Sequence, residues 1–303
     1  MVRPLLQPKC RSNLMRPPRR SARANSLKVS RGWRVVALVY LALLLTFALA
    51  PFLWMLRTAL SPQADAFQSV PTLLPSSFTL NNFVSVLVST VNPFTRQFLN
   101  TTVVALSSTA LCLALGLTGA YSLSRFSYRG RSMISVSLLF MQLLPAVLLA
   151  IPLFLVLNRL GLANSLTGLV LAYATINLPF SVWILKGYLK DIPVEVEEAA
   201  RIDGCTHFGT LFRIVLPTVA PALVAVATLV FVNAWNEYLL ALVLVNEPSK
   251  QVLGVGLTSY VSQFSTDLPG LFAMSTLTTL PVVLLFVLLQ RRLIGGLSAG
   301  AVK

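Results

Sequence analysis

The chain has 303 residues, of which 56% are hydrophobic and only 11% are charged, and its net charge is +15. Soluble domains carry about 25% charged residues, so this composition excludes an ordinary water-soluble fold. The positive charge lies in tails and in loops that flank apolar runs, with no folded soluble domain to present it. That distribution disfavours a nucleic-acid-binding protein.

The N-terminal tail is the most basic part of the chain. Residues 1–34 hold ten Lys and Arg and no acid. This composition is typical of a disordered arm near anionic lipid headgroups, and it also resembles that of a transit peptide. Met15 is an alternative start. We assign the tail, residues 1–32, no function and expect residues 33–303 to form the transmembrane domain.

Six apolar segments are long enough to cross a bilayer, which takes roughly 20 apolar residues. We place the spans at 35–56, 99–123, 133–157, 166–187, 218–240 and 270–289. The first run contains Ala48-Leu49-Ala50, which imitates a signal-peptide cleavage site, but it continues to Met55. It is therefore longer than a signal core of roughly 7–15 residues. The sequence predicts an all-α, polytopic membrane protein with six transmembrane helices.

Positive residues indicate the orientation of the spans. Twenty of the 24 Lys and Arg lie in the N-terminal tail, in 124–132, in 186–217 and in the C-terminal tail, which are alternate connections. Positive residues remain on the cytoplasmic side of a membrane. Both termini are therefore expected in the cytoplasm, with the chain crossing the inner (plasma) membrane several times.

The predicted spans contain almost no charged side chains and no histidine. Ion-coupled transport requires charged residues within the membrane, and here only Lys186 and Glu237 lie near span ends. The sole histidine, His207, lies in a loop. These features disfavour an ion-driven secondary transporter and an intramembrane enzyme. The cysteines suggest neither a disulfide nor a metal site, and we expect no metal or cofactor. They are Cys10, Cys112 and Cys205.

The most informative stretch is 191–217, which holds five of the nine acidic residues. Pro193 suits a first helical turn, Gly204 a left-handed turn and Thr206 the cap of a second helix. That second helix carries one apolar stripe, formed by Phe208, Leu211, Phe212 and Val215. Pro217 is expected to end it. The pattern predicts a cytoplasmic elbow of two amphipathic helices, which suits a partner's groove and equally suits packing on lipid headgroups.

Residue identities separate these two interpretations. Glu198-Ala199-Ala200, Gly204 after three residues and Ile214-Val215-Leu216-Pro217 after nine more resemble the EAA loop of binding-protein-dependent ABC transporter permeases. Asp203-Gly204, the segment 231–239 and the C-terminal segment 290–303 are similar to the second (G-type) permease of the carbohydrate branch, the maltose/glycerol-phosphate-like permeases. The resemblance covers about residues 30–303. Cys205 departs from it, because the branch usually has alanine there.

The resemblance implies a type I ABC importer permease fold and a function in translocating a sugar, such as a maltose-type oligosaccharide. The implied partners are a homologous permease subunit, two cytoplasmic ATP-binding subunits and an external solute-binding protein. The chain has no G-x-x-x-x-G-K-[ST] motif, so ATP hydrolysis is expected on a partner and the chain is not expected to be an enzyme. The ATPase-coupling residues that the resemblance implies are Glu198, Ala199, Ala200, Arg201, Asp203, Gly204, Phe208, Phe212, Leu216 and Pro217.

The end of the fifth span supplies a second set of candidates, for a substrate path or gate. They are Asn233, Trp235, Asn236, Glu237 and Tyr238. An aromatic ring beside several hydrogen-bonding groups suits a sugar, although Trp and Tyr at span ends are more often interface anchors. Glycerol-3-phosphate, another small polar solute or an amino acid are alternative substrates. The similarity of this segment and of the C-terminus to the carbohydrate branch favours a carbohydrate.

Overall fold

The structure is a computed structural model that describes residues 31–68, 72–261 and 266–299, with side chains described between residues 32 and 290. Most of the tail expected at 1–32, and the last residues of the C-terminal motif, lie outside the described residues. The chain divides into two compact units, residues 1–50 and 51–303. The first holds the N-terminal part of one helix, and all the other elements belong to the second.

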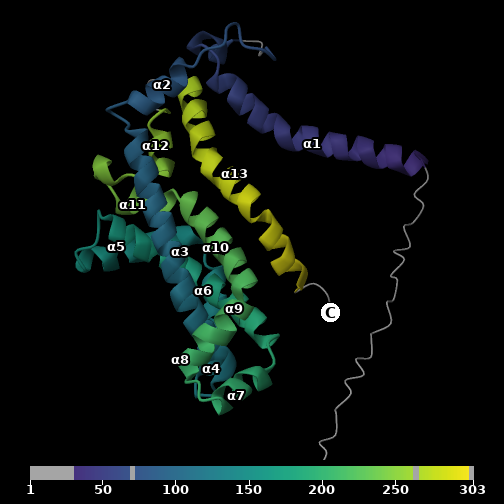
Figure 1. The fold of residues 1–303 in the computed structure, drawn as a ribbon. Helices are drawn as coiled ribbons and strands as arrows, with labels where there is room; N and C mark the ends of the chain where they lie inside the picture. Colours follow the sequence, from purple (N-terminus) through teal and green to yellow (C-terminus); the bar gives the residue numbers. More distant parts are fainter. Residues whose placement is uncertain (1–30, 69–71, 262–265, 300–303) are drawn as a thin grey trace, which may run out of the picture. The chain divides into compact units, whose positions relative to one another are not determined.

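The described residues form helices, turns and one isolated bridge between Val261 and Thr266, and they include no strand (Figure 1). The elements are α1 (Arg31–Ala59), η1 (Gln63–Phe67), α2 (Asn81–Val88), α3 (Phe94–Arg125), α4 (Arg131–Leu143), α5 (Ala146–Arg159), α6 (Leu166–Lys190), α7 (Val194–Ile202), α8 (His207–Thr210), η2 (Leu211–Val215), α9 (Leu216–Thr218), α10 (Ala220–Trp235), α11 (Leu239–Leu244), η3 (Pro248–Lys250), α12 (Leu253–Thr258) and α13 (Leu268–Ala299).

The number of candidate membrane spans agrees with the expected fold class. In the described part of the chain, α1, α3, α6 and α13 are each long and apolar enough to cross a bilayer. Two bent pairs raise the number of candidates to six: α4 with α5, and residues 207–218 with α10. The expected all-helical membrane fold is confirmed, and the six predicted spans correspond to the four long helices and the two bent pairs.

The third expected span, 133–157, differs from a single straight helix. It consists of α4 and α5, and the chain bends by 109° between them. Leu144 is extended (φ −78°, ψ 124°), and Pro145 is the residue that precedes the first residue of α5, Ala146. A residue before proline is pushed out of the helical region, and the proline has no amide to donate. The break follows from the Leu144-Pro145 pair.

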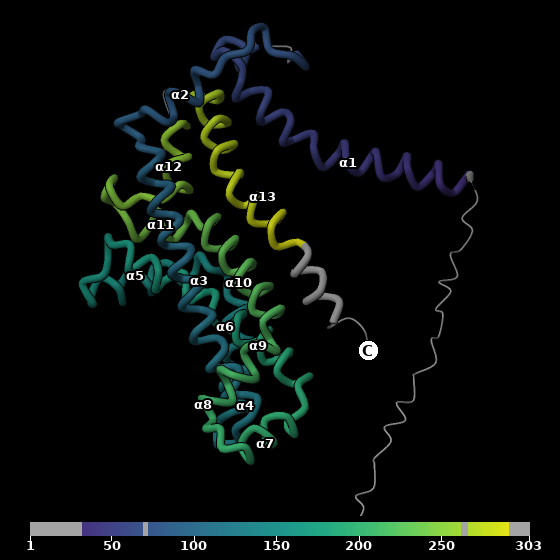
Figure 2. Tube along the Cα trace, viewed as in Figure 1, coloured from purple at the N-terminus to yellow at the C-terminus, as the bar shows by residue number. Residues whose placement is uncertain are grey.

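The core of the second unit is a group of three helices, α3, α6 and α10, which run beside one another (Figure 2). Small residues allow α3 and α6 to approach closely, as is common between membrane helices. A Cβ added to Gly116 of α3 would lie 3.1 Å from the Cβ of Ser181 on α6. The thiol of Cys112 donates to the carbonyl of Ala174 at 3.6 Å. These contacts hold the centre of the bundle together.

Candidate coupling elbow and candidate polar face

The first candidate site is the coupling elbow, which we define as residues 191–218. The α7 helix ends in a left-handed turn at Gly204, whose φ is +88°. The amide of Gly204 donates to the carbonyl of Arg201, and the amide of Cys205 donates to that of Ala200, both at 3.0 Å. These two bonds form the Schellman motif, which satisfies the last carbonyls of a helix. The predicted glycine corner is present.

The second arm of the elbow is the helical segment 207–218. It begins after the predicted cap, Thr206, and ends one residue after the predicted stop, Pro217. The Thr206 hydroxyl accepts a hydrogen bond from the amide of Gly209 at 3.1 Å, which caps the arm. Residues 211–215 form a π turn in which the Leu216 amide donates to Leu211. The helix then continues through Pro217 to residue 218, and the chain bends by 78° before α10. Pro217 was expected to end the helix, which instead passes it with one backbone bond missing.

The apolar stripe of the second arm divides into two parts. Leu211 and Val215 are buried against the bundle, while Phe208 is 72% exposed and Phe212 is 53% exposed. Because such a stripe covers about 100° of a helix, one edge can contact the core while the other remains outside. The two phenylalanines, both expected as coupling residues, therefore project from the elbow.

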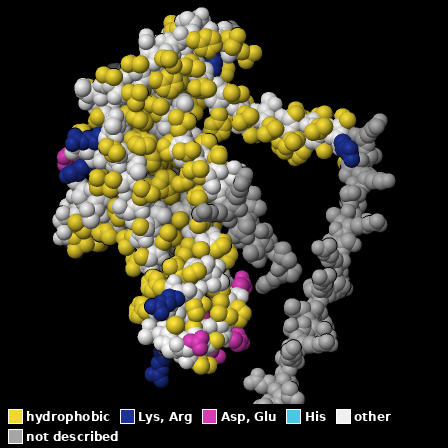
Figure 3. Space-filling view, viewed as in Figure 1, with side chains coloured by type: hydrophobic (Ala, Val, Ile, Leu, Met, Phe, Trp, Pro, Cys, Tyr) yellow, Lys and Arg dark blue, Asp and Glu magenta, His cyan; other side chains and the backbone are white. Residues whose placement is uncertain are grey.

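Most of the other expected coupling residues are also accessible. Glu198, Ala199, Arg201, Asp203, Gly204 and Pro217 are exposed, Leu216 is half-buried and Ala200 is buried. Glu198 lies 3.8 Å from Arg201 in an exposed ion pair, which contributes little to stability. Acidic side chains gather at this end of the molecule (Figure 3). The elbow therefore presents apolar rings beside negative charge.

Glu197, the neighbour of Glu198, points inwards and was not among the predicted site residues. It is 4% exposed. Its Oε1 accepts a hydrogen bond from Nε of Arg125 at 2.6 Å, and its Oε2 accepts one from the Tyr121 hydroxyl at 2.9 Å. Arg125 also donates from Nη2 to the carbonyl of Ile192 at 3.0 Å. Adjacent residues on a helix point about 100° apart, so Glu197 can face the bundle while Glu198 faces outwards.

A small apolar pocket lies between α3 and the second arm. Its volume is about 150 Å³, and its walls include Tyr121, Phe126, His207, Phe208 and Leu211. The His207 ring packs edge-on against Phe126, with centroids 5.3 Å apart. A pocket of this size and polarity suits one apolar side chain.

The second candidate set, at the end of α10, divides into buried and exposed residues. Trp235 is buried, stacks on Phe231 with centroids 5.5 Å apart, and donates from Nε1 to the carbonyl of Thr278 at 3.2 Å. The Glu237 carboxylate accepts the amides of Leu240 at 2.8 Å and of Ala241 at 3.2 Å, so it caps α11. Both side chains support local structure.

The remaining three members of this set lie on the surface. Asn233 is exposed and donates to Oδ1 of the buried Asn177 at 3.3 Å. Asn236 is exposed and bonds back to the carbonyl of Val232, and Tyr238 is also exposed. An amide on the face of a membrane helix is costly in lipid, so this face suits a wet path or a protein contact.

The described residues contain no group of three or more His, Cys, Asp or Glu side chains that could hold a metal ion. Cys112 is a buried free thiol of α3, Cys205 is a half-buried free thiol of the elbow, and Cys10 lies outside the described residues.

A family model and two similar curated proteins each match most of this chain and agree with one another. The profile of the family "binding-protein-dependent transport system inner membrane component" matches residues 113–298. The chain is 36% identical over 263 residues to the inner membrane ABC transporter permease protein YcjP of Escherichia coli, covering 87% of this chain and 94% of that one. It is 33% identical over 273 residues to the diacetylchitobiose uptake system permease protein DasC of Streptomyces coelicolor, covering 90% and 97%.

A solved structure shares the fold. It is a chain of a bacterial ABC transporter involved in the import of the acidic polysaccharide alginate, with a TM-score of 0.73 and 26% sequence identity. The superposition covers 87% of this chain and 98% of that chain. The expected importer permease fold is confirmed.

Proposed function

The chain belongs to the family of binding-protein-dependent transport system inner membrane components, and we propose that it is one of two homologous membrane subunits of an ATP-driven carbohydrate importer. It is the multi-pass inner-membrane permease, and the ATPase is a separate subunit. The elbow is the observation that carries the proposal, because its glycine corner presents two exposed phenylalanines and an exposed glutamate to the outside. Both termini, like the elbow, would then face the cytoplasm.

Each part of the elbow has a role in docking the ATPase. Glu198 makes the polar contact, Gly204 sets the angle between the two arms, and Phe208 and Phe212 enter an apolar groove. The 150 Å³ pocket beside Phe208 receives one apolar side chain of the ATPase. Because Glu198 and Asp203, which belong to the docking motif, are exposed, the groove on the ATPase should have a basic rim where it faces them.

ATP binding on the partner subunits closes them against each other and moves the elbows of the two permeases. The pore then switches from inward-facing to outward-facing, and an external binding protein releases its sugar into it. The exposed amides Asn233 and Asn236, together with Tyr238, line this path. Trp235 fixes the end of α10 against α13, and Glu237 caps α11.

The carbohydrate assignment draws on relatives whose names state their substrates. The Streptomyces relative takes up diacetylchitobiose, and the solved transporter imports alginate. Amide and aromatic side chains on the α10 face suit the hydroxyl groups and apolar faces of sugar rings.

The docking proposal is tested by expressing the chain with its partner permease, ATPase and binding protein. Glu198→Ala and Gly204→Asp should insert normally but lose ATP-driven uptake and retain less ATPase during purification. Glu195→Ala, which removes an exposed acid of α7 outside the docking motif, is the matched control. Normal uptake and normal co-purification in both docking variants would contradict the proposal.

The substrate class is tested on the binding protein. Its melting temperature is measured with a panel of mono- and oligosaccharides, glycerol-3-phosphate and amino acids. A bound ligand present at 100 times its Kd stabilises by about 2.7 kcal/mol, which is readily detected. A shift with at least one sugar is expected. A shift with amino acids alone would overturn the carbohydrate assignment.

A further inference from the structure

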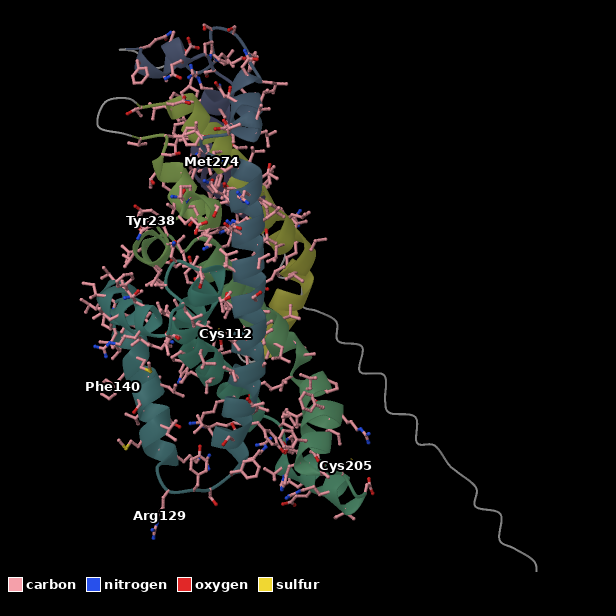
Figure 4. The ribbon with its side chains drawn as sticks, turned by 90° about the vertical axis from the view of Figure 1, so that its left-hand side faces the viewer. Cys112, Arg129, Phe140, Cys205, Tyr238 and Met274 are labelled. Carbon is pink, nitrogen blue, oxygen red and sulfur yellow. The ribbon has the colours of Figure 1, made fainter. Side chains whose placement is uncertain are left out.

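The α3 helix differs from the other long helices in containing no proline. It runs for 32 residues, Phe94–Arg125, or about 48 Å at 1.5 Å per residue. The other three long spans each contain an internal proline: Pro51 in α1, Pro179 in α6 and Pro281 in α13. Proline removes a backbone bond and kinks a helix, so α3 is the stiffest of the four. Cys112 marks its middle in Figure 4, and Arg129 lies just beyond its C-terminal end.

The cytoplasmic end of α3 is fastened to the elbow. Of the nine residues of α7, all of them described, Glu197 and Ala200 are buried. Glu197 is the one that makes polar bonds into α3, through Arg125 and Tyr121. Arg125 holds a second point on the elbow, the carbonyl of Ile192. Bonds to charged groups are shorter and stronger than neutral ones, so this cluster is the main attachment of α7 to the bundle.

The opposite end of α3 is fastened to residues 249–259, between α11 and α13. Asn100 donates to the carbonyls of Ser249 at 3.0 Å and Gln251 at 2.8 Å. Thr101 accepts the amide of Leu253 at 2.9 Å. Just before α3, Asn92 donates to the carbonyl of Gly256 at 3.1 Å. This segment lies on the external side in the proposed orientation, where the binding protein would dock.

We infer that Glu197 and Arg125 are positioning residues that clamp the coupling elbow to α3, and that α3 is a rod which carries ATP-driven movement of the elbow to the external segment 249–259. The inference rests on the proposed docking function. Only Glu198 of the glutamate pair faces the ATPase, and Glu197 transmits the resulting force into the membrane. The elbow and α3 then move as one body.

A distance measurement tests the clamp. Spin labels are placed at Ile202, which is 86% exposed on α7, and at Leu115, exposed on α3. Cys10 and Cys205 are replaced by alanine, and the buried Cys112 is kept. The complete complex is measured without ATP and trapped with ATP and vanadate. The label distance should be the same in both states of the parent complex and should change on trapping in Glu197→Ala, whereas Glu195→Ala should behave as the parent.

The stimulation of ATP hydrolysis by the binding protein gives a second readout. It should fall about tenfold in Glu197→Ala, the size of a typical coupling effect between sites. The double variant Arg125→Gln with Glu197→Gln should recover part of the loss, because no unpaired buried charge remains. Asn100→Ala should leave the label distance constant and still reduce stimulation, because it releases the other end of the rod.

Three results would overturn the inference: a label distance that changes on trapping in the parent, a constant distance in Glu197→Ala, or full stimulation in that variant. A merely structural role for Glu197 would reduce assembly and leave the distance constant in the complex that forms. Failure of the proposed function would differ, because the parent itself would not retain the ATPase.

Discussion

Replacing Gly204 isolates the energetic contribution of the elbow's corner. The backbone there has a φ of +88°, and an added Cβ would meet no atom within 4 Å. The whole effect of Gly204→Ala is therefore backbone strain, about 1–2 kcal/mol for an ordinary residue in the left-handed region. Gly204→Asn should cost less, because asparagine tolerates this conformation. Gly204→Val should cost at least as much as alanine, because a β-branched side chain is least suited to positive φ.

Hydrogen exchange of the elbow amides measures how far this backbone strain opens the corner. The amide of Cys205, bonded to Ala200, should lose protection about 5- to 30-fold in the alanine variant if the strain opens the corner locally. Protection should follow the order Gly, Asn, Ala, Val. Equal losses in the asparagine and alanine variants would refute the reasoning, because they would indicate a steric cause where the structure has open space.

Three further predictions concern other parts of the chain. Gly256→Ala should destabilise the folded protein by about 1–3 kcal/mol, because the new Cβ would lie 2.0 Å from Oε1 of Gln97. Adding Gln97→Ala should restore part of the melting temperature. A melting temperature that does not recover would contradict a steric clash with Gln97. The backbone and hydroxyl of Ser76 hold the pKa of Asp65 below its usual value. The ionised Asp65 should therefore stabilise the fold fully above about pH 4, and this stabilisation should be lost as the pH falls through the lowered pKa. When the melting temperature is measured from about pH 3 to 7, it should fall more at low pH in the parent than in Asp65→Asn. Cys205→Ala should leave the melting temperature and ATPase co-purification unchanged, because the thiol is free and half-buried.

Local signals made the elbow predictable. Gly204 and Thr206 act through bonds to residues three to five positions away, so their roles can be inferred from spacing alone. The helical spans were predictable for a similar reason, because bilayer thickness fixes the length of an apolar run. The spacing of residues in the sequence did not predict where the second arm ends, because the π turn before Pro217 depends on how the helix packs.

Tertiary contacts account for what the sequence did not reveal. Glu197 and Glu198 are chemically identical, and the hydrogen bonds from Arg125 and Tyr121, 72 and 76 residues away, mark Glu197 as the buried one. The role of Glu237 as the cap of α11 was not foreseen, because α11 is too short to be recognised from periodicity. The bend between α4 and α5 had a local signal in Leu144-Pro145, which the continuous apolar run concealed.

The 78° bend between the elbow and α10 has a consequence for the pore. A single non-helical residue, Val219, separates the two helices, so this junction can act as a pivot. A torque on the elbow would pass into α3 through the Glu197 clamp, and the bend at Val219 lets the elbow turn relative to α10. Because α10 packs along α3 and α6, it would receive the movement sideways from these two helices and not along its own axis. The polar face that carries Asn233 and Asn236 would then be displaced together with the core, and its opening would follow the movement of α3.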